Sequence, residues 1–347
     1  MFQLTPSLDS GDASANLRKL ITADINADLF RSSIQRLQNR FDIYSSTCPA
    51  PFIAPGLIVT PEIHRQSELY LPITEITGIF NRLYRSVLSY PPILSSPPFH
   101  NTLSWADVFV GLPRYLQFTV NPALLLEKLL TDRDLLMAFL FESFLPHRFY
   151  GGFGRYPDQE GFIREWLARQ QKMPLRCLDA ACGTGEDCYG LANLLIESGK
   201  DLEGVRIEGW TIEPLEVWAA AHCCFPHDRH REVQFREKTS RLFEMGYSSR
   251  ISFRCADLTI PPPAEPFDLI LCNGLLGGPI VNELLELKRV VSCLTSLLAP
   301  GGILLAADSF HGGWKQQCPQ QGLRALLEMN GLKTFQAGEG IGGLKPD

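Results

Sequence analysis

The sequence predicts an α/β protein whose second half is a Rossmann-like, doubly wound sheet and whose first half is a mainly helical domain. One observation is the alternation, after about residue 174, of short apolar runs with helical segments. This alternation is typical of a parallel sheet covered by helices. The other is that apolar residues in the first half recur at helical spacing between proline-rich stretches. We therefore divide the chain into residues 1–148 and 149–347.

The first half contains three regions with helical character. Residues Leu17–Phe41 carry apolar side chains at helical spacing, and Pro61–Ser89 is a second such region that we expect to break near Pro72. A further helix begins at Asn121-Pro122, because asparagine is a favoured N-cap and proline a favoured first helical residue. Residues 1–16 are small and polar, and we expect them to be loose. This helical half is a candidate cap over the second half or a dimerisation surface.

The second half reads as strands separated by helices. The expected strands are Leu175–Asp179, Arg206–Ile212, Ile251–Cys255, Phe267–Cys272, Ile303–Ala307 and Leu332–Gln336. The expected helices are Leu191–Ser198, Leu215–Cys224, Val281–Leu298 and Gly322–Asn330. The run Phe267–Cys272 is almost wholly apolar, which indicates a strand buried on both faces. A final antiparallel strand would have to come from Gly340–Lys345, and we expect it to be short or absent.

A glycine-rich turn after the first of these strands is the strongest functional signal. In the run Leu178–Glu186, Gly183 and Gly185 let the backbone approach a ligand without a Cβ in the way, and the following helix offers free N–H groups there. A dinucleotide site requires a third glycine where this chain has Cys188. The carboxylates of Asp179 and Glu186 would repel a pyrophosphate but attract an ammonium and a sulfonium. The turn therefore favours S-adenosylmethionine over a dinucleotide.

The later strand ends add further candidate contacts to the same ligand. After the second strand, either Thr211 or Glu213 occupies the position of a ribose-binding carboxylate. We favour Glu213, because side chains two residues apart in a strand share a face. After the third strand, Asp257 can accept a hydrogen bond from the adenine amino group while Leu258 packs on the ring. After the fourth, Asn273 opens into the crevice at the carboxyl edge of the sheet.

The run Ala180-Ala181-Cys182-Gly183-Thr184-Gly185-Glu186-Asp187, followed by Tyr189 and Leu191-Ala192, resembles the first motif of the chemotaxis-receptor (CheR-type) glutamate methyltransferases. The segment Phe267–Cys272 and the upstream Phe153-Gly154-Arg155-Tyr156-Pro157 are similar to further segments of that family. The resemblance covers roughly residues 150–310. It implies a class I methyltransferase in which Ala181 contacts the cofactor and Arg155 binds the carboxylate of its methionine part. A guanidinium suits that role, because its donors can form two parallel bonds to a carboxylate.

Departures from the family pattern concern the substrate more than the cofactor. Asn273-Gly274 stands where the family has Arg-Asn, and no aromatic pair follows Leu275-Leu276. The stretch Pro214–Ser252 is shorter than the family's receptor-contacting insertion. The resemblance therefore implies S-adenosylmethionine but does not carry the receptor substrate over to this chain.

The sequence leaves the methyl acceptor open between a small molecule and a protein carboxylate. An ionised carboxylate needs no base, whereas a hydroxyl or amine does. The polar candidates for a base are Asn273, Tyr150, Tyr156 and His311. The glycines of Phe149–Gly154 suggest either a mobile segment over the site or a simple linker. Two alternatives are a degenerate cofactor-binding module on the same fold and, disfavoured by Cys188, a nucleotide-dependent oxidoreductase.

Composition narrows the remaining function classes. A net charge of −6 disfavours a nucleic-acid partner, and 45% apolar with 20% charged residues is typical of a soluble globular protein. No signal peptide or membrane-length apolar run is evident, so we expect a cytoplasmic protein. The ten cysteines read as free thiols. The cluster His222, Cys223, Cys224, His227 and His230 lacks the usual zinc spacing, so we expect no metal.

Overall fold

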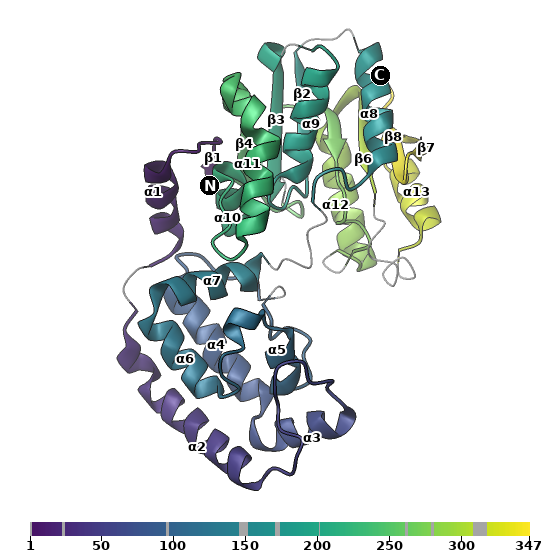
Figure 1. The fold of residues 1–347 in the computed structure, drawn as a ribbon. Helices are drawn as coiled ribbons and strands as arrows, with labels where there is room; N and C mark the ends of the chain where they lie inside the picture. Colours follow the sequence, from purple (N-terminus) through teal and green to yellow (C-terminus); the bar gives the residue numbers. More distant parts are fainter. Residues whose placement is uncertain are drawn as a thin grey trace. The chain divides into compact units, whose positions relative to one another are not determined.

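The computed structural model describes residues 2–22, 25–94, 97–145, 152–170, 174–200, 202–260, 263–278, 281–307 and 318–347. The chain forms two compact units (Figure 1). The sheet unit comprises Met1–Ala13, Tyr150–Cys224 and His230–Asp347, and the helical unit comprises Ser14–Phe149 and Phe225–Arg229. The chain thus crosses between the units more often than a single boundary near residue 148 would require.

The expectation that residues 1–16 are loose is wrong, because the segment contains a short strand and the first part of helix α1 (Ser10–Leu20). Strand β1 (Gln3–Leu4) pairs antiparallel with β4 (Ile251–Cys255) at the edge of the sheet. His222 Nδ1 lies 2.8 Å from the carbonyl oxygen of Ser7, and Trp218 Nε1 donates to the carbonyl oxygen of Ala13 at 2.8 Å. The physical reason is that an edge strand offers unpaired backbone groups, which an extended polar segment can satisfy without an apolar pattern of its own.

The helical unit is built around α4 (Ile73–Val87), whose buried face includes Ile76, Phe80 and Tyr84. The expected break near Pro72 is present, because α3 (Pro61–Tyr70) ends just before it. Asn121 caps the helix that follows it, since its side chain accepts a hydrogen bond from Ala123 N at 2.9 Å. The other helices of this unit are α2 (Arg31–Thr47), α5 (Trp105–Gly111), α6 (Pro122–Thr131) and α7 (Arg133–Phe144).

The helical region predicted over Leu17–Phe41 is interrupted. Helix α1 (Ser10–Leu20) ends within this region, and a short 3-10 turn at Ala27–Phe30 leads directly into α2. Asn26 caps that turn by accepting a hydrogen bond from Asp28 N at 3.0 Å. Local capping by asparagine therefore overrides the continuous apolar spacing.

The sheet has eight strands in the order β1-β4-β3-β2-β5-β6-β8-β7. The strands from β4 to β6 run parallel, and β8 is antiparallel to both of its neighbours. Besides β1 and β4, the strands include β2 (Leu175–Asp179), β3 (Val205–Thr211), β5 (Phe267–Leu271), β6 (Leu298–Ala306) and β7 (Lys333–Ala337). This confirms the Rossmann-like, doubly wound fold predicted from the alternating pattern.

Strand β8 (Gly340–Leu344) is fully formed, so the expectation that this strand is short or absent is wrong. Its glycines explain how it fits between two neighbours. A Cβ at Gly340 would lie 2.1 Å from Ala306 O, and one at Gly342 would lie 2.2 Å from Phe335 Cε2. The glycines that weaken the strand pattern in the sequence therefore permit close approach in the sheet.

Helices cover the sheet on both faces. Helices α8 (Pro157–Arg169), α9 (Glu186–Glu197) and α11 (Arg229–Glu244) lie in front of the sheet in Figure 1, and α10 (Pro214–His222) follows β3. Helices α12 (Leu284–Leu297) and α13 (Gln320–Met329) share a core with the strands. That core includes Leu178, Trp210, Phe267, Ile270, Leu287, Val291, Leu326 and Leu327.

Candidate functional site

The sheet has a topological switch between β2 and β5. From β2 the chain proceeds outward to β3 and β4, and later it returns to β5 on the other side of β2. Ligands of open α/β sheets bind at the carboxyl ends of the strands where the order reverses. Asp179 ends β2, and Asn273 follows β5 after one intervening residue. The residues singled out from the sequence therefore meet at the expected edge.

The glycine turn has the backbone conformation that its sequence predicts. Gly183 and Gly185 have φ angles of 50° and 92°, and Gly185 is the N-cap of α9. A Cβ at Gly185 would lie 2.8 Å from Phe253 Cε1, so this glycine is also required for packing against β4. Cys182 N donates to Trp210 O at 3.0 Å, which ties the turn to β3. The turn is thus fixed against β3 and β4, and it places the N-terminus of α9 at the switch point.

Asp179 is buried beneath the turn. Its Oδ1 accepts a hydrogen bond from Ala181 N at 3.3 Å, and its Oδ2 lies 3.5 Å from Cys188 Sγ. Burial, and then the neighbouring Asp187 carboxylate, raise the pKa of Asp179 well above its ordinary value. Asp179 therefore supports the turn from within and holds a carboxyl group that an approaching cation would help to ionise.

Glu186 is paired with a residue that the sequence reasoning missed. Arg231, from α11, binds Glu186 Oε1 and Thr184 Oγ1 through Nη2, and Thr184 Oγ1 donates to Glu186 Oε2 at 2.7 Å. Only 7% of the Arg231 side chain and 10% of the Glu186 side chain are exposed, so the pair is desolvated. Glu186 thus has a cationic partner within the protein, and the attraction of a ligand ammonium rests on other carboxylates.

Asp187 is a second residue that the prediction of the site from the sequence missed, although it belongs to the glycine-turn motif. Its Oδ2 accepts a hydrogen bond from Asn273 Nδ2 at 2.9 Å. Burial raises the pKa of Asp187, while the bond from Asn273 and the charge of Arg155 act in the opposite direction. A half-buried carboxylate beside an arginine at this edge is therefore the better-placed partner for a ligand ammonium.

Both the oxygen and the nitrogen of the Asn273 amide form hydrogen bonds within the protein. It forms a reciprocal pair with Gln159, with Asn273 Nδ2 to Gln159 Oε1 at 2.9 Å and Gln159 Nε2 to Asn273 Oδ1 at 3.1 Å. Asn273 Oδ1 also accepts from Ala307 N at 3.0 Å. Glu339 fixes the start of α8 by accepting from the backbone N–H groups of Asp158 and Gln159 at 3.0 and 2.9 Å. Asn273 thus joins β5, β6, α8 and α9 around the switch point.

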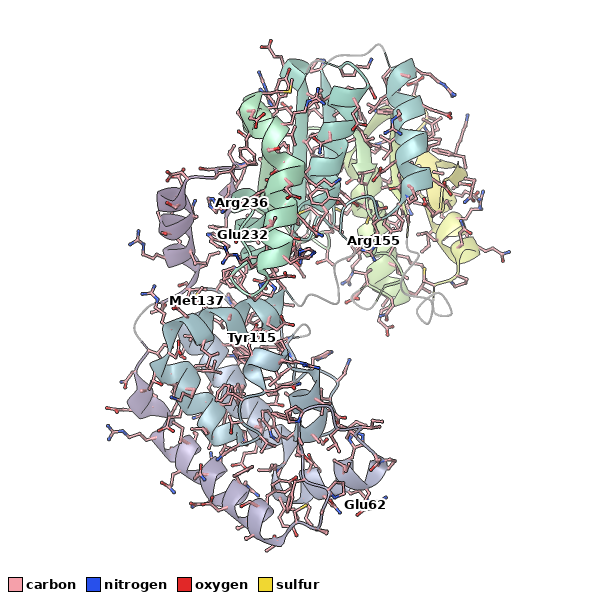
Figure 2. The ribbon with its side chains drawn as sticks, viewed as in Figure 1. Glu62, Tyr115, Met137, Arg155, Glu232 and Arg236 are labelled. Carbon is pink, nitrogen blue, oxygen red and sulfur yellow. The ribbon has the colours of Figure 1, made fainter. Side chains whose placement is uncertain are left out.

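Arg155 lies in the segment that leads into α8 (Figure 2). A Cβ at Gly274 would lie 3.5 Å from Arg155 Nη1, and the guanidinium lies 5.3 Å from the ring centroid of Tyr156. Gly274 has a φ of 73°. The structure therefore brings Arg155 next to the end of β5 and near Asp187, and its role toward a ligand carboxylate stays a prediction.

The ends of β3 and β4 carry the residues expected at the ribose and adenine. Glu213 is buried and caps α10, because its Oε1 accepts from Leu215 N at 3.0 Å, and Thr211 Oγ1 donates to Glu216. Asp257 is exposed and accepts from Thr259 N and Thr259 Oγ1 at 2.8 and 2.7 Å. Leu258 is buried, with 6% exposed. Thr211 ends β3 and Glu213 follows two residues later, so the choice between them for the ribose stays open.

The candidate features of the acceptor site have different outcomes. Tyr156 is buried, with 2% exposed, which removes its hydroxyl from an open crevice. Tyr150 and His311 lie outside the described residues, as does the first part of the Phe149–Gly154 segment. Asn273 is engaged as described above.

Among the described residues, no group of three or more His, Cys, Asp or Glu side chains is arranged to hold a metal ion. All ten cysteines are free thiols, and Cys223 is buried at the end of α10. No described helix is long and apolar enough to cross a membrane.

Comparison with known proteins agrees with this geometry. Residues 160–309 match the family model of the CheR methyltransferase SAM-binding domain. A probable biofilm formation methyltransferase, WspC, of Pseudomonas putida is 29% identical over 142 residues, covering 38% of this chain and 33% of that protein. The Pseudomonas aeruginosa WspC is 25% identical over 173 residues, covering 44% of this chain and 39% of that protein. The chain therefore matches little more than a third of the length of these relatives.

A search of solved structures adds a more distant likeness. The N-methyltransferase NodS of Bradyrhizobium japonicum in complex with S-adenosyl-L-homocysteine is 16% identical, with a TM-score of 0.37 over 58% of this chain and 92% of that one. The stretch that matches the family model includes the glycine turn and the residues at the ends of β2, β3, β4 and β5. Residues 160–309 are therefore similar to the S-adenosylmethionine-binding domain of the CheR-type, class I methyltransferases.

Proposed function

We propose that this protein transfers a methyl group from S-adenosylmethionine to a protein carboxylate. The observation that carries the proposal is the charge arrangement at the carboxyl edge, where Arg155 and Asp187 both lie near the end of β5. An amino-acid moiety presents one carboxylate and one ammonium, which are complementary to these two charges.

The remaining residues fit the rest of the cofactor. Glu213 lies just after the end of β3, where its carboxylate could accept hydrogen bonds from the hydroxyl groups of a ribose. Leu258 is an apolar side chain on which an adenine could pack, and Gly183 presents no Cβ to the ligand. When bound, the cofactor supplies an electrophilic methyl group on a sulfonium, and the protein's task is to hold the acceptor in line with it.

The polar side chains described at this edge favour a carboxylate acceptor, because they are buried or already hydrogen-bonded within the protein. An amide cannot take a proton from an acceptor, and both ends of the Asn273 amide are engaged. Tyr156 is buried. Since an ionised carboxylate attacks without deprotonation, it needs neither group. The described residues therefore support an acceptor that brings its own negative charge.

The first test is a calorimetric titration of the purified protein with S-adenosylhomocysteine. We expect binding by the wild type and loss of binding in Gly183→Asp, where a side chain and a charge enter the turn. Arg155→Met should weaken binding about 10- to 100-fold, since a hydrogen bond to a charged group contributes about 1.5–3 kcal/mol. A well-folded wild type that shows no binding would contradict the proposal.

The second test identifies the acceptor chemistry. The protein is incubated with methyl-labelled S-adenosylmethionine and a lysate, and the products are separated into protein and small molecules. A methyl ester is cleaved by mild alkali to release methanol, whereas an N-methyl or ether product is stable. Alkali-labile label on protein is the expected result. Label in the small-molecule fraction, or stable label, would overturn the carboxylate-protein assignment.

A second candidate function is a cofactor-binding module without turnover. The observation that favours it is the replacement of the family's Arg-Asn pair by Asn273-Gly274, together with the engaged amide of Asn273. This candidate predicts that S-adenosylhomocysteine binds normally while no lysate component accepts label.

A further inference from the structure

Helix α11 has an unusual inward face. The helix is strongly polar, with the sequence RHREVQFREKTSRLFE, and its buried residues are Arg231, Phe235, Thr239 and Leu242. These four positions follow helical spacing, so they form one face. An arginine at the start of a buried face is expensive unless it is paired and hydrogen-bonded. The position of Arg231 therefore calls for a specific partner.

The partner is the cofactor turn. Arg231 binds both Glu186, the first residue of α9, and Thr184, between the two glycines of the turn. Thr184 is fully buried and donates to Glu186 at 2.7 Å, so each of the three side chains contacts the other two. Because the ion pair is desolvated, removing either member costs the other a charged partner in a buried position. The conformation of the turn is thus tied to a residue 45 positions later in the chain.

The next turn of α11 contacts the segment that carries Arg155. The guanidinium of Arg231 lies 5.6 Å from the ring centroid of Phe235. Phe235 packs edge-on against Phe153, with ring centroids 4.9 Å apart, and against Tyr189 at 6.4 Å. Phe153 lies two residues before Arg155. One face of α11 therefore supports the glycine turn through Arg231 and the Arg155 segment through Phe235.

We propose that Arg231 is a positioning residue for the cofactor, which holds the Thr184–Glu186 turn in its binding conformation through a two-point contact. The inference rests on the proposed function, because it concerns the same cofactor site. Arg231 acts through the turn and touches no cofactor atom itself. Both bonds are donated by Nη2 at the outer end of a planar guanidinium, and we expect the compact ammonium of a lysine to replace them only in part.

The test compares S-adenosylhomocysteine affinity in matched variants. Arg231→Met should raise the Kd at least tenfold, and Arg231→Lys should restore part of that loss. The control is Arg236→Met, because Arg236 lies on the same helix but is 50% exposed and pairs with Glu232 at 3.2 Å (Figure 2). Arg236→Met should change the Kd less than twofold. Thermal unfolding of each variant reports on folding separately.

A double-mutant cycle distinguishes positioning from general destabilisation. Glu186→Gln should also weaken binding, and Glu186→Gln with Arg231→Met should bind no more weakly than the worse single variant, because both changes disrupt one contact. If Arg231→Met fails to fold, Thr184→Val, which removes only the bridging hydroxyl, should raise the Kd at least threefold while the protein stays folded.

The outcomes separate this inference from the proposed function. Wild-type binding with an unchanged Kd in folded Arg231→Met overturns the positioning role and leaves the function intact. If Arg231→Met does not fold, an unchanged Kd in Thr184→Val overturns it as well. Losses that multiply in the double variant also contradict it, since they would show two independent effects. Absence of binding by the wild type would overturn the proposed function, and the inference with it.

Discussion

The two units differ in what they bury. In the helical unit the buried polar side chains are uncharged, namely Ser33, Ser67, Ser104, Asn121 and Ser143 among the described residues. In the sheet unit Asp179, Glu186, Glu213, Arg231 and Asp268 are buried as well. Buried charge is costly, and it persists where partners or function compensate for it. Among the described residues, the sheet unit therefore buries ionisable side chains, most of them near the carboxyl edge of its sheet, whereas the helical unit buries only uncharged polar ones.

The largest effect is expected in the helical core. Phe80 is fully buried and packs against Phe99 and Phe139, with centroids 4.7 and 5.8 Å apart. Phe80→Ala should destabilise this unit by about 3–5 kcal/mol. Hydrogen exchange should show lost protection in α4, while the sheet strands and S-adenosylhomocysteine binding stay unchanged. Equal loss of protection in β2 and β5 would break the division into two units.

A smaller effect, confined to the sheet unit, is expected at Gly185. Its φ of 92° and the 2.8 Å approach of a Cβ to Phe253 both oppose a side chain. Gly185→Ala should cost about 3 kcal/mol, from left-handed strain and overpacking together. The measurement is again hydrogen exchange, now with lost protection in β2, β3 and β4. A control is Gly190→Ala, where a Cβ would meet nothing within 4 Å. Equal effects of the two changes would refute the packing argument.

The buried carboxylates of the sheet unit predict a pH dependence. The pKa of Asp187 is raised mainly by burial, and so is that of Asp179. Because the folded protein binds such a proton more tightly than the unfolded chain does, the protonated carboxyl group stabilises the fold at low pH. This stabilisation is fully present below the pKa of the unfolded chain and is lost as the pH rises through the pKa of the folded protein. A bound ammonium favours the ionised form, so binding releases protons and affinity should increase with pH through this range. Titrations in buffers of different ionisation enthalpy measure that release, and Asp187→Asn should reduce it. An unchanged release in that variant would remove Asp187 from the ammonium site.

The smallest effect tests the segment Phe225–Arg229, which belongs to the helical unit although it lies between two helices of the sheet unit. His227 Nε2 lies 2.9 Å from the carbonyl oxygen of Leu145, and its ring stacks on Phe141 at 5.9 Å. His227→Ala should destabilise the helical unit by about 1 kcal/mol through the lost hydrogen bond. Exchange protection should fall in α7 and not in β2. The opposite pattern would assign the segment to the sheet unit.

Much of the sheet unit could be predicted from the sequence. The run Phe267–Leu271 is apolar because both faces of a central parallel strand are covered, and the glycines at 183 and 185 mark a turn that only positive φ angles allow. The residues from Asp179 to Asn273 follow strands whose carboxyl ends share one edge. Such signals are local, so they can be recognised in the sequence without knowing which residues are neighbours in the folded protein.

Other features were decided by the tertiary structure alone. Helix α11 escaped prediction because its inward face begins with Arg231 and includes Thr239, so no apolar stripe marks it. Strand β1 is two residues long and is defined by the free edge of β4. The partner of Glu186 lies 45 positions away, and the pairing of Asn273 with Gln159 spans 114. The sequence by itself determined the strands and the cofactor turn, because backbone geometry and burial leave periodic local marks. Only the folded chain decided which charges meet, because a buried ion pair depends on two residues that no local pattern connects.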